Sequence, residues 1–192
     1  MKLLEDRILK DGIVLPGDIL KVDCFLNHMI DPVLLRQLGE EFGRLYKDAG
    51  ITKILTVEAS GIAVAFAASA YFGDCPVVFA KKGEVSTMSK DTYTADVHSY
   101  TRNKDLKLNV AKKFLQKEDT VLLVDDFLAN GAALSGLLEI CEQAGCRIAG
   151  AGIVIEKVYQ GGGSAVRAKG IRVESLAKIR SMDDSGKIEF CD

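Results

Sequence analysis

The stretch VLLVDDFLANGAALSGLL, from Val121 to Leu138, places two aspartates directly after four aliphatic residues and then enters a loop of small residues. Adjacent side chains of a strand point to opposite faces, so Asp125 and Asp126 can both be satisfied only where the strand ends. Open α/β sheets bind ligands at the carboxyl ends of their strands. The pair therefore indicates a binding site at the end of a buried strand.

The loop after this pair, ANGAA, opens an expected helix. Unpaired N–H groups and the positive end of the helix dipole favour a phosphate there, and small side chains let it approach the backbone closely. Carboxylates only accept hydrogen bonds, which suits the hydroxyls of a sugar. The stretch predicts a site for a phosphorylated ribose; the alternative is a capped strand-to-helix turn with solvated aspartates.

Hydrophobic patterning around this stretch predicts an α/β fold with a parallel, twisted sheet flanked by helices. KILTV and PVVFA bracket a helical segment at 61–72, and TVLLV and AGAGIVIE bracket another at 132–142, which makes two βαβ units. The segment DPVLLRQLGEEFGRLYKDAG predicts an amphipathic helix between Asp31-Pro32 and Gly50. Its expected apolar stripe consists of Val33, Leu34, Leu38, Phe42 and Leu45.

The remaining segments are expected to belong to the same single domain, 1–192. Residues from about 1 to 30 and the tail from Ile171 onward are expected to add edge strands or a small flap. Residues from about 83 to 101 are rich in Ser, Thr, Asp and Tyr and predict a long mobile excursion, although TYTADVHSYT alternates enough for a β-ribbon.

The composition is that of an ordinary globular protein whose partners are small molecules. A net charge of −2 gives no global reason to bind nucleic acid, and the most apolar run, GIAVAFAASAYFG, is too short to span a membrane. The five cysteines are an odd number without a CxxC pair, which argues against structural zinc and for a reducing compartment. The sequence therefore predicts a cytoplasmic protein.

The motif DDFLANGAA resembles the phosphoribosyl pyrophosphate (PRPP) motif of the type I phosphoribosyltransferases. ILKVDCFLNHMIDP, TVEASGIA, IVIEK and RVESLAKI extend the resemblance over nearly the whole chain, and it is greatest for the family members that act on xanthine. Phe127 and Asn130 depart from the general motif, which usually has an aliphatic residue and a Thr or Ser there, and both match the xanthine-specific variant.

The resemblance assigns a role to each motif. Asp125 and Asp126 would bind the ribose hydroxyls, and the loop Ala129, Asn130, Gly131, Ala132 and Ala133 would hold the 5′-phosphate. In Glu58–Gly61, Ser60 and Gly61 would bind the pyrophosphate. Leu20 and Asn27 would lie in a flap over the base, although Leu20 is equally a core residue and Asn27 a plain turn former.

The resemblance also implies Mg²⁺ bound through PRPP, a homodimer, and a lid formed by about 83–101. At Lys81 and Lys82, a cation could meet the pyrophosphate, or the pair could simply be solvated. No general acid or base is assigned to Glu58 or His98, since an isolated His in a Ser/Thr-rich loop is more often a surface residue.

Two residues bear on the choice of base. Ala129 stands where hypoxanthine-guanine relatives carry an aspartate, which can act as a general base. Xanthine, the most acidic common purine, depends least on a general base. Lys157 offers donors but no acceptor, which favours a 6-oxopurine over adenine. We expect the protein to transfer the phosphoribosyl group of PRPP to xanthine, which yields xanthosine 5′-monophosphate (XMP). The alternatives are an adenine phosphoribosyltransferase and a PRPP-sensing module without catalysis.

Overall fold

The fold was analysed in a computed structural model that describes residues 1–83, 91–99 and 104–191. Within these residues, eight strands form one sheet in the order β10-β9-β8-β7-β3-β4-β6-β5, and β1 and β2 form a separate hairpin. The strands of the described residues are β1 (Ile13–Leu15), β2 (Ile19–Lys21), β3 (Lys53–Val57), β4 (Val77–Lys82), β5 (Thr92–Ser99), β6 (Lys104–Ala111), β7 (Thr120–Leu128), β8 (Arg147–Lys157), β9 (Val173–Met182) and β10 (Ile188–Phe190).

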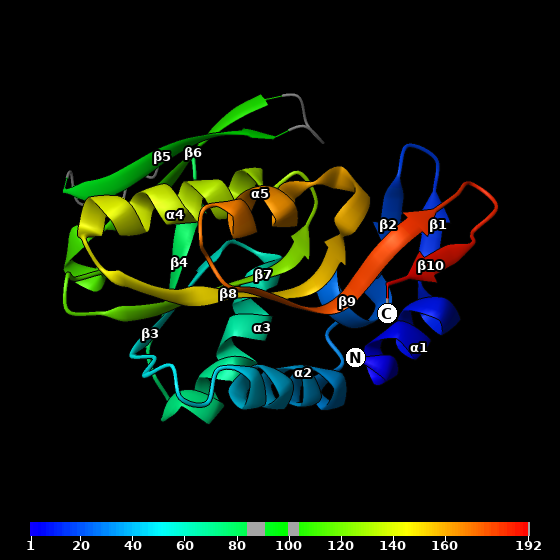
Figure 1. The fold of residues 1–192 in the computed structure, drawn as a ribbon, viewed down its shortest axis with the longest axis horizontal. Coiled ribbons are helices and arrows are strands. Elements are labelled where there is room, and N and C mark those ends of the chain that lie inside the picture. The colour runs from blue at the N-terminus through cyan, green and yellow to red at the C-terminus, as the bar shows by residue number, and fades with distance from the viewer. Residues whose placement is uncertain (84–90, 100–103, 192) are drawn as a thin grey trace.

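Helices cover both faces of this sheet. Figure 1 shows α2 and α3 on one side of it and α4 and α5 on the other. The helices and helical turns of the described residues are α1 (Lys2–Asp11), η1 (Asp23–Asn27), α2 (Pro32–Leu45), α3 (Ser60–Ser69), η2 (Ala70–Phe72), η3 (Lys112–Phe114), α4 (Ala132–Ala144), η4 (Val158–Gln160) and α5 (Gly162–Ala168). None of the helices in this part of the chain has the length and apolar character needed to span a membrane.

Both predicted βαβ units are present, and the α/β fold class is confirmed. Strands β4, β3, β7, β8 and β9 are parallel neighbours. The sheet as a whole is mixed, because β6 pairs antiparallel with β4, and β10 pairs antiparallel with β9. The five parallel strands bring their carboxyl ends to one edge of the sheet.

The predicted amphipathic helix is α2. The Asp31 side chain caps it by accepting hydrogen bonds from the backbone N–H groups of Val33 and Leu34 at 3.0 and 3.1 Å. Val33 was wrongly placed in the apolar stripe: it is exposed, whereas Leu35 is buried. Val33 shares a helix face with Arg36 and Glu40, three and seven positions further on, and all three are exposed.

The N-terminal residues share the main core. Leu20 and Phe25 belong to the same apolar cluster as residues of α2, α3 and β9. The amino terminus of Met1 donates a hydrogen bond to the carbonyl of Leu176 in β9. In Figure 1, both chain ends lie beside each other near α1. The N-terminal segment and the tail therefore meet, and their role as a flap over the base stays a prediction.

Part of the predicted excursion is regular structure. Residues 92–99 form β5, which pairs antiparallel with β6 over eight residues, so the β-ribbon is confirmed. The rest of that excursion, 84–90 and 100–101, lies outside the described residues.

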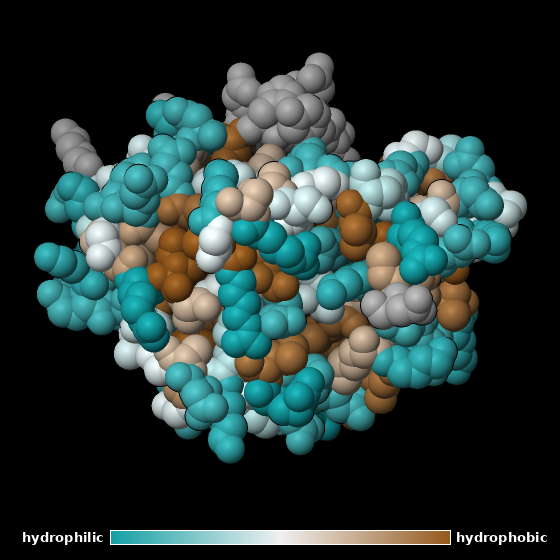
Figure 2. All heavy atoms as spheres, viewed as in Figure 1, coloured by the Kyte–Doolittle hydropathy of each residue, from teal (hydrophilic) through white to brown (hydrophobic). Residues whose placement is uncertain are grey.

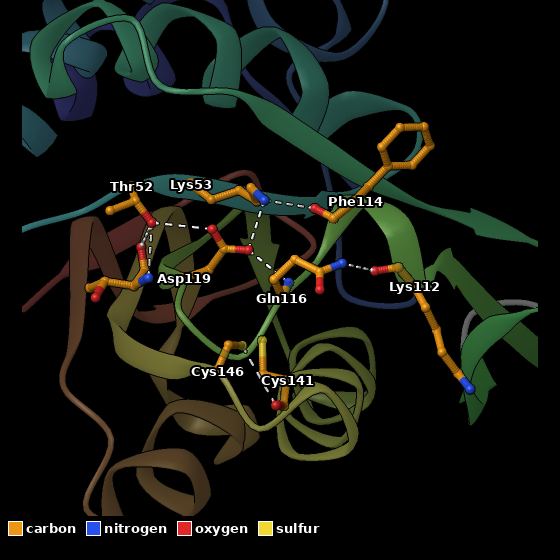
Figure 3. Close-up of polar contacts among 9 residues, drawn as sticks. Thr52, Lys53, Lys112, Phe114, Gln116, Asp119, Cys141 and Cys146 are labelled. Atoms are coloured by element: carbon orange, nitrogen blue, oxygen red, sulfur yellow. Dashed lines mark hydrogen bonds and ion pairs between the residues drawn. The ribbon is translucent and has the colours of Figure 1, made fainter.

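A network of hydrogen bonds and an ion pair connects residues at the opposite edge of the sheet, where the parallel strands begin (Figure 3). Lys53 Nζ lies 2.7 Å from Asp119 Oδ2 and donates to the Phe114 carbonyl at 2.9 Å. The same carboxylate accepts the Gln116 N–H at 2.8 Å. Burial would raise the pKa of Asp119, but the hydrogen bonds from Lys53 and Gln116, with the charge of Lys53, outweigh it and lower that pKa.

We expect Asp119→Asn to lower the free energy of unfolding at pH 7 by about 1.5–3 kcal/mol, the usual value of hydrogen bonds to a charged group. Because the folded pKa is lowered, the contribution of Asp119 is present above its unfolded pKa and is lost as the pH falls through its folded pKa. Urea unfolding at pH 7 and in acid should show the wild-type advantage only at pH 7. Asp96→Asn, which removes an exposed carboxylate 3.9 Å from Lys107, is the control that should change little.

Candidate active site

Asp125 and Asp126 lie at the sheet edge formed by the carboxyl ends of the parallel strands. The sequence predicted that the strand ends at this pair. The strand instead continues to Leu128. β7 pairs with β3 only as far as Leu123, whereas its pairing with β8 continues to Leu128. The strand runs on because β8 remains alongside, while β3 leaves the acids unpaired on its side.

Asp125 is the buried member of the pair, at 8% exposure. Its Oδ1 accepts a hydrogen bond from the backbone N–H of Asp126 at 3.0 Å. Burial raises the pKa of Asp125 well above its usual value; the charge of Asp126 adds to this and the charge of Lys82 opposes it. The ionised carboxylate is costly here unless a cation or a hydroxyl donor approaches it.

Asp126 meets the N-terminal segment. Its Oδ2 accepts a hydrogen bond from Nδ2 of Asn27, the last residue of η1, at 2.7 Å. The structure thus brings Asn27 to the acidic pair, although 99 positions separate the two residues. Leu20 is 6% exposed and belongs to the core cluster, which is the alternative left open for it. Contact of either residue with a base stays a prediction.

The predicted phosphate loop joins β7 to α4. Gly131 has φ = 85°, a conformation that favours glycine. Asn130 Oδ1 accepts the Ala132 N–H at 3.1 Å, so this side chain caps its own loop, and that N–H has a partner within the loop. The following N–H groups of the first turn of α4, beginning at Ala133, have no carbonyl within the helix to bind. This loop can hold an anion at the amino end of α4.

The predicted pyrophosphate loop joins β3 to α3. Glu58 Oε1 accepts the backbone N–H of Lys82 at 2.6 Å, which ties the loop to the end of β4. The Glu58–Ala59 peptide bond is cis, and Ser60 begins α3. A Cβ at Gly61 would lie 2.1 Å from Thr56 Oγ1 and 3.2 Å from Asp125 Oδ1. Only glycine lets this loop pack directly beside Asp125.

Alternation along β8 separates Glu156 from Lys157 as predicted. Glu156 is fully buried and forms two hydrogen bonds with Arg167 of α5, at 2.7 and 2.8 Å. Lys157 is 8% exposed, and its Nζ donates to the backbone carbonyl of Asp18 at the tip of the β1–β2 hairpin. Burial lowers the pKa of Lys157, and the charge of Asp18 opposes this. Lys157 is therefore the member of the pair that meets the N-terminal hairpin.

The two lysines at the end of β4 are in different environments. Lys82 is exposed, and its positive charge acts on Asp125 by opposing the rise in the pKa of that carboxyl group. Lys81 lines a separate groove together with Phe79 and Phe114. Of the two, Lys82 is the one placed toward the acidic pair.

Sequence reasoning missed Gly162, which packs on the phosphate loop. Its N–H donates to the Ala129 carbonyl at 3.1 Å, and a Cβ there would lie 2.4 Å from that oxygen and 2.5 Å from the Gly131 nitrogen. The run Gly161–Gly163 was the available signal, since consecutive glycines mark a close approach of two backbones. Sequence reasoning also missed Asp18, because no motif or spacing in the sequence marked this residue.

Together, these residues place an acidic pair and the amino ends of two helices at one edge of the sheet, an arrangement that can accommodate a phosphorylated sugar with an anionic leaving group. No group of three or more His, Cys, Asp or Glu side chains able to hold a metal ion occurs among the described residues. Mg²⁺ is commonly held by one or two carboxylates together with substrate phosphates. Asp125 and Asp126 fit a Mg²⁺ ion that is shared with such a substrate.

Comparison with known proteins agrees with this geometry. The family model described as "Phosphoribosyl transferase domain" matches residues 34–178. The xanthine phosphoribosyltransferase of Lactiplantibacillus plantarum is 56% identical over 95% of this chain and 93% of its own, and that of Finegoldia magna is 53% identical over 98% of each. The adenine phosphoribosyltransferase of Giardia lamblia, solved with 9-deazaadenine, covers 91% of this chain and 97% of its own with a TM-score of 0.77. At 24% identity, this likeness concerns the fold alone.

Proposed function

We infer, because the chain belongs to the phosphoribosyltransferase family, that it transfers the phosphoribosyl group of PRPP to xanthine, with XMP and diphosphate as products. The observation that carries this proposal is the meeting of Asp125 and Asp126 with the phosphate loop, the pyrophosphate loop and Lys157 at one edge of the sheet. The relatives named for this activity match almost the whole chain.

In this reaction the bond between ribose C1 and the diphosphate oxygen breaks, and diphosphate leaves with the electron pair. A purine nitrogen supplies the pair for the new bond to C1, and the proton that this nitrogen carries in the neutral base passes to solvent; xanthine, the most acidic common purine, loses it most easily. The carboxylates of Asp125 and Asp126 accept hydrogen bonds from the ribose hydroxyls and lie near the positive charge that develops on the sugar. The loop from Ala129 to Ala133 holds the 5′-phosphate and fixes the position of C1. Mg²⁺, which we expect to enter with PRPP, would neutralise the leaving diphosphate.

A direct assay separates this proposal from a PRPP-sensing module. Incubation with xanthine, PRPP and Mg²⁺ should yield XMP and diphosphate in equal amounts. Saturable PRPP binding without any product would favour the sensing module instead.

We expect Lys157→Ala to raise the KM for xanthine, with a loss of about 1.5–3 kcal/mol for a hydrogen bond from a charged donor to the oxygen at purine C6. Binding of PRPP should barely change. The measurement is the ratio of kcat/KM for xanthine and adenine, with the Kd for PRPP. Lys47→Ala, an exposed lysine after α2, is the control. An unchanged ratio would remove the selectivity role and reopen the adenine alternative.

We also propose a homodimer, as the family resemblance implies. A groove between β4 and β6 is lined by Val77, Phe79, Val110 and Phe114, and both phenylalanines are exposed. Neighbouring apolar side chains that remain exposed are typical of an interface. The occupant we commit to is the same face of a second copy, because a two-fold contact is self-complementary.

We expect Phe114→Glu to shift the protein from dimer to monomer in light scattering after size exclusion, because it places a charge in the groove. Leu9→Glu, which changes an exposed apolar residue of α1 outside the groove, should leave the mass unchanged. A Phe114→Glu protein of dimeric mass, or a monomeric wild type, would contradict this interface.

We place the enzyme in the cytoplasm. All five cysteines are free thiols, which fits a reducing compartment.

A further inference from the structure

The β1–β2 hairpin has few means of holding its own position. Each strand has three residues, and an isolated two-stranded hairpin of this length is marginal in water. Ile13, Leu15 and Ile19 leave their side chains exposed, so the hairpin anchors itself through its other face, where Leu20 is buried. In Figure 1, the hairpin stands beside β9 and β10 at the end of the molecule. The position of its tip therefore depends on specific contacts.

Asp18, at the tip, makes three such contacts with residues at the end of β8 and in the turn after it. Its carboxylate accepts hydrogen bonds from the Tyr159 hydroxyl through Oδ1 and from Gln160 Nε2 through Oδ2. Its backbone carbonyl accepts from Lys157 Nζ. Asp18 has φ = 64°, a left-handed conformation that Asp tolerates better than most residues. These contacts link the tip of the hairpin to positions about 140 residues away in sequence.

We propose that Asp18 is a positioning residue for recognition of the purine base, and that it acts through Lys157. The proposal rests on the proposed function, in which Lys157 donates to the base. An ammonium has three donors on a flexible stem, and the bond to the Asp18 carbonyl fixes one of them. The two remaining donors then have a defined direction. The carboxylate bonds with Tyr159 and Gln160 keep that carbonyl in place and hold the hairpin over the end of β8.

The substitution that isolates the carboxylate is Asp18→Gly. Glycine adopts a positive φ without strain, so the backbone conformation is kept while both side-chain hydrogen bonds are lost. Asp18→Asn keeps one acceptor oxygen and should be intermediate. Tyr159→Phe removes one donor from the other side of the contact and should act in the same direction as Asp18→Asn. Asp183→Gly is the matched control, because the Asp183 carboxylate accepts hydrogen bonds from Ser185 and Lys187 of its own hairpin turn.

The readout is the Michaelis constant of each substrate. Asp18→Gly should raise the KM for xanthine about tenfold and leave the KM for PRPP within about twofold, as expected when one fixed hydrogen bond is lost. In a Lys157→Ala background, Asp18→Gly should add little, because residues that act through one contact are not additive. A merely structural role would lower Tm and affect both substrates alike.

Equal changes in both Michaelis constants, or an effect that adds in full to that of Lys157→Ala, would overturn the proposal. If Asp18→Gly does not fold, Tyr159→Phe carries the same test. Failure of the proposed function is distinct, because it would appear in the wild type as absence of XMP formation. Failure of the role of Asp18 would instead appear when the wild type forms XMP but the Asp18 variants give one of the contradicting results above.

Discussion

An Asp126→Asn variant should fold normally and lose roughly a hundredfold or more in kcat, the usual effect of removing one electrostatic contact to a transition state. An amide has one acceptor oxygen and no charge, so it cannot stabilise the cationic sugar as a carboxylate does. The bond between Asn27 and residue 126 can persist through the amide oxygen, so the fold should be kept. Steady-state rates with PRPP and xanthine, together with Tm, measure this.

The matched control for this variant is Asp6→Asn, which weakens the contact of an exposed carboxylate of α1 with Lys2. It should keep wild-type rates. Turnover like that of the wild type in a folded Asp126→Asn protein would remove the ribose-binding role of Asp126.

A Glu156→Gln variant should lose about 3 kcal/mol of unfolding free energy, at the low end of the cost of removing one partner of a buried ion pair. Glu156 is fully buried and is also hydrogen-bonded by Ser175 Oγ at 2.5 Å. Burial would raise its pKa, but the hydrogen bonds from Arg167 and Ser175 and the charge of Arg167 lower it overall. The loss should be at the low end because Arg167 is 36% exposed and can regain water.

Urea unfolding at pH 7 measures this loss, with Glu174→Gln as the control. Glu174, in the neighbouring strand β9, pairs with Arg172 at the surface, where an ion pair contributes at most about 1 kcal/mol. Equal stability of the Glu156→Gln protein and the wild type would show that the buried pair contributes nothing net.

Local patterns in the sequence were sufficient for much of the fold. Asp31-Pro32 marked the start of α2, and the β-branched runs marked the parallel strands, because period and capping act over a few residues. The course of β7 past Asp126 could not be predicted in this way. It depends on how far β8 stays alongside, which is a long-range pairing.

The same division holds for the site. The acidic pair and the small-residue loop are contiguous in sequence, so their chemistry could be recognised directly. The contact between Asn27 and Asp126, and that between Asp18 and Lys157, join residues about 100 and 140 positions apart. No local pattern carries that information. Gly162 was an intermediate case, because its glycine run marked a close approach but not the loop it approaches.

Surface character shows a further limit of sequence patterns. Figure 2 shows hydrophobic side chains between hydrophilic ones on the side of the molecule where α4 and α5 lie. A groove there is lined by Val97, Leu138, Ile148 and Ile171, together with Asn130 and Ala132 of the phosphate loop. Residues from β5, α4, β8 and the connections between elements form this surface. Only the tertiary structure reveals that it borders the site.

The measurement that tests the account most directly is the kcat/KM of the wild-type protein for xanthine, guanine, hypoxanthine and adenine, each with saturating PRPP and Mg²⁺. Adenine should give the lowest value, because the ammonium of Lys157 can donate to an oxygen at C6 but not pair with an amino group there. Xanthine should give the highest value, because it is the most acidic of the four bases and depends least on a general base, which Ala129 does not supply. A higher kcat/KM for guanine, hypoxanthine or adenine than for xanthine, or no turnover with any of the four bases, would contradict the proposed function.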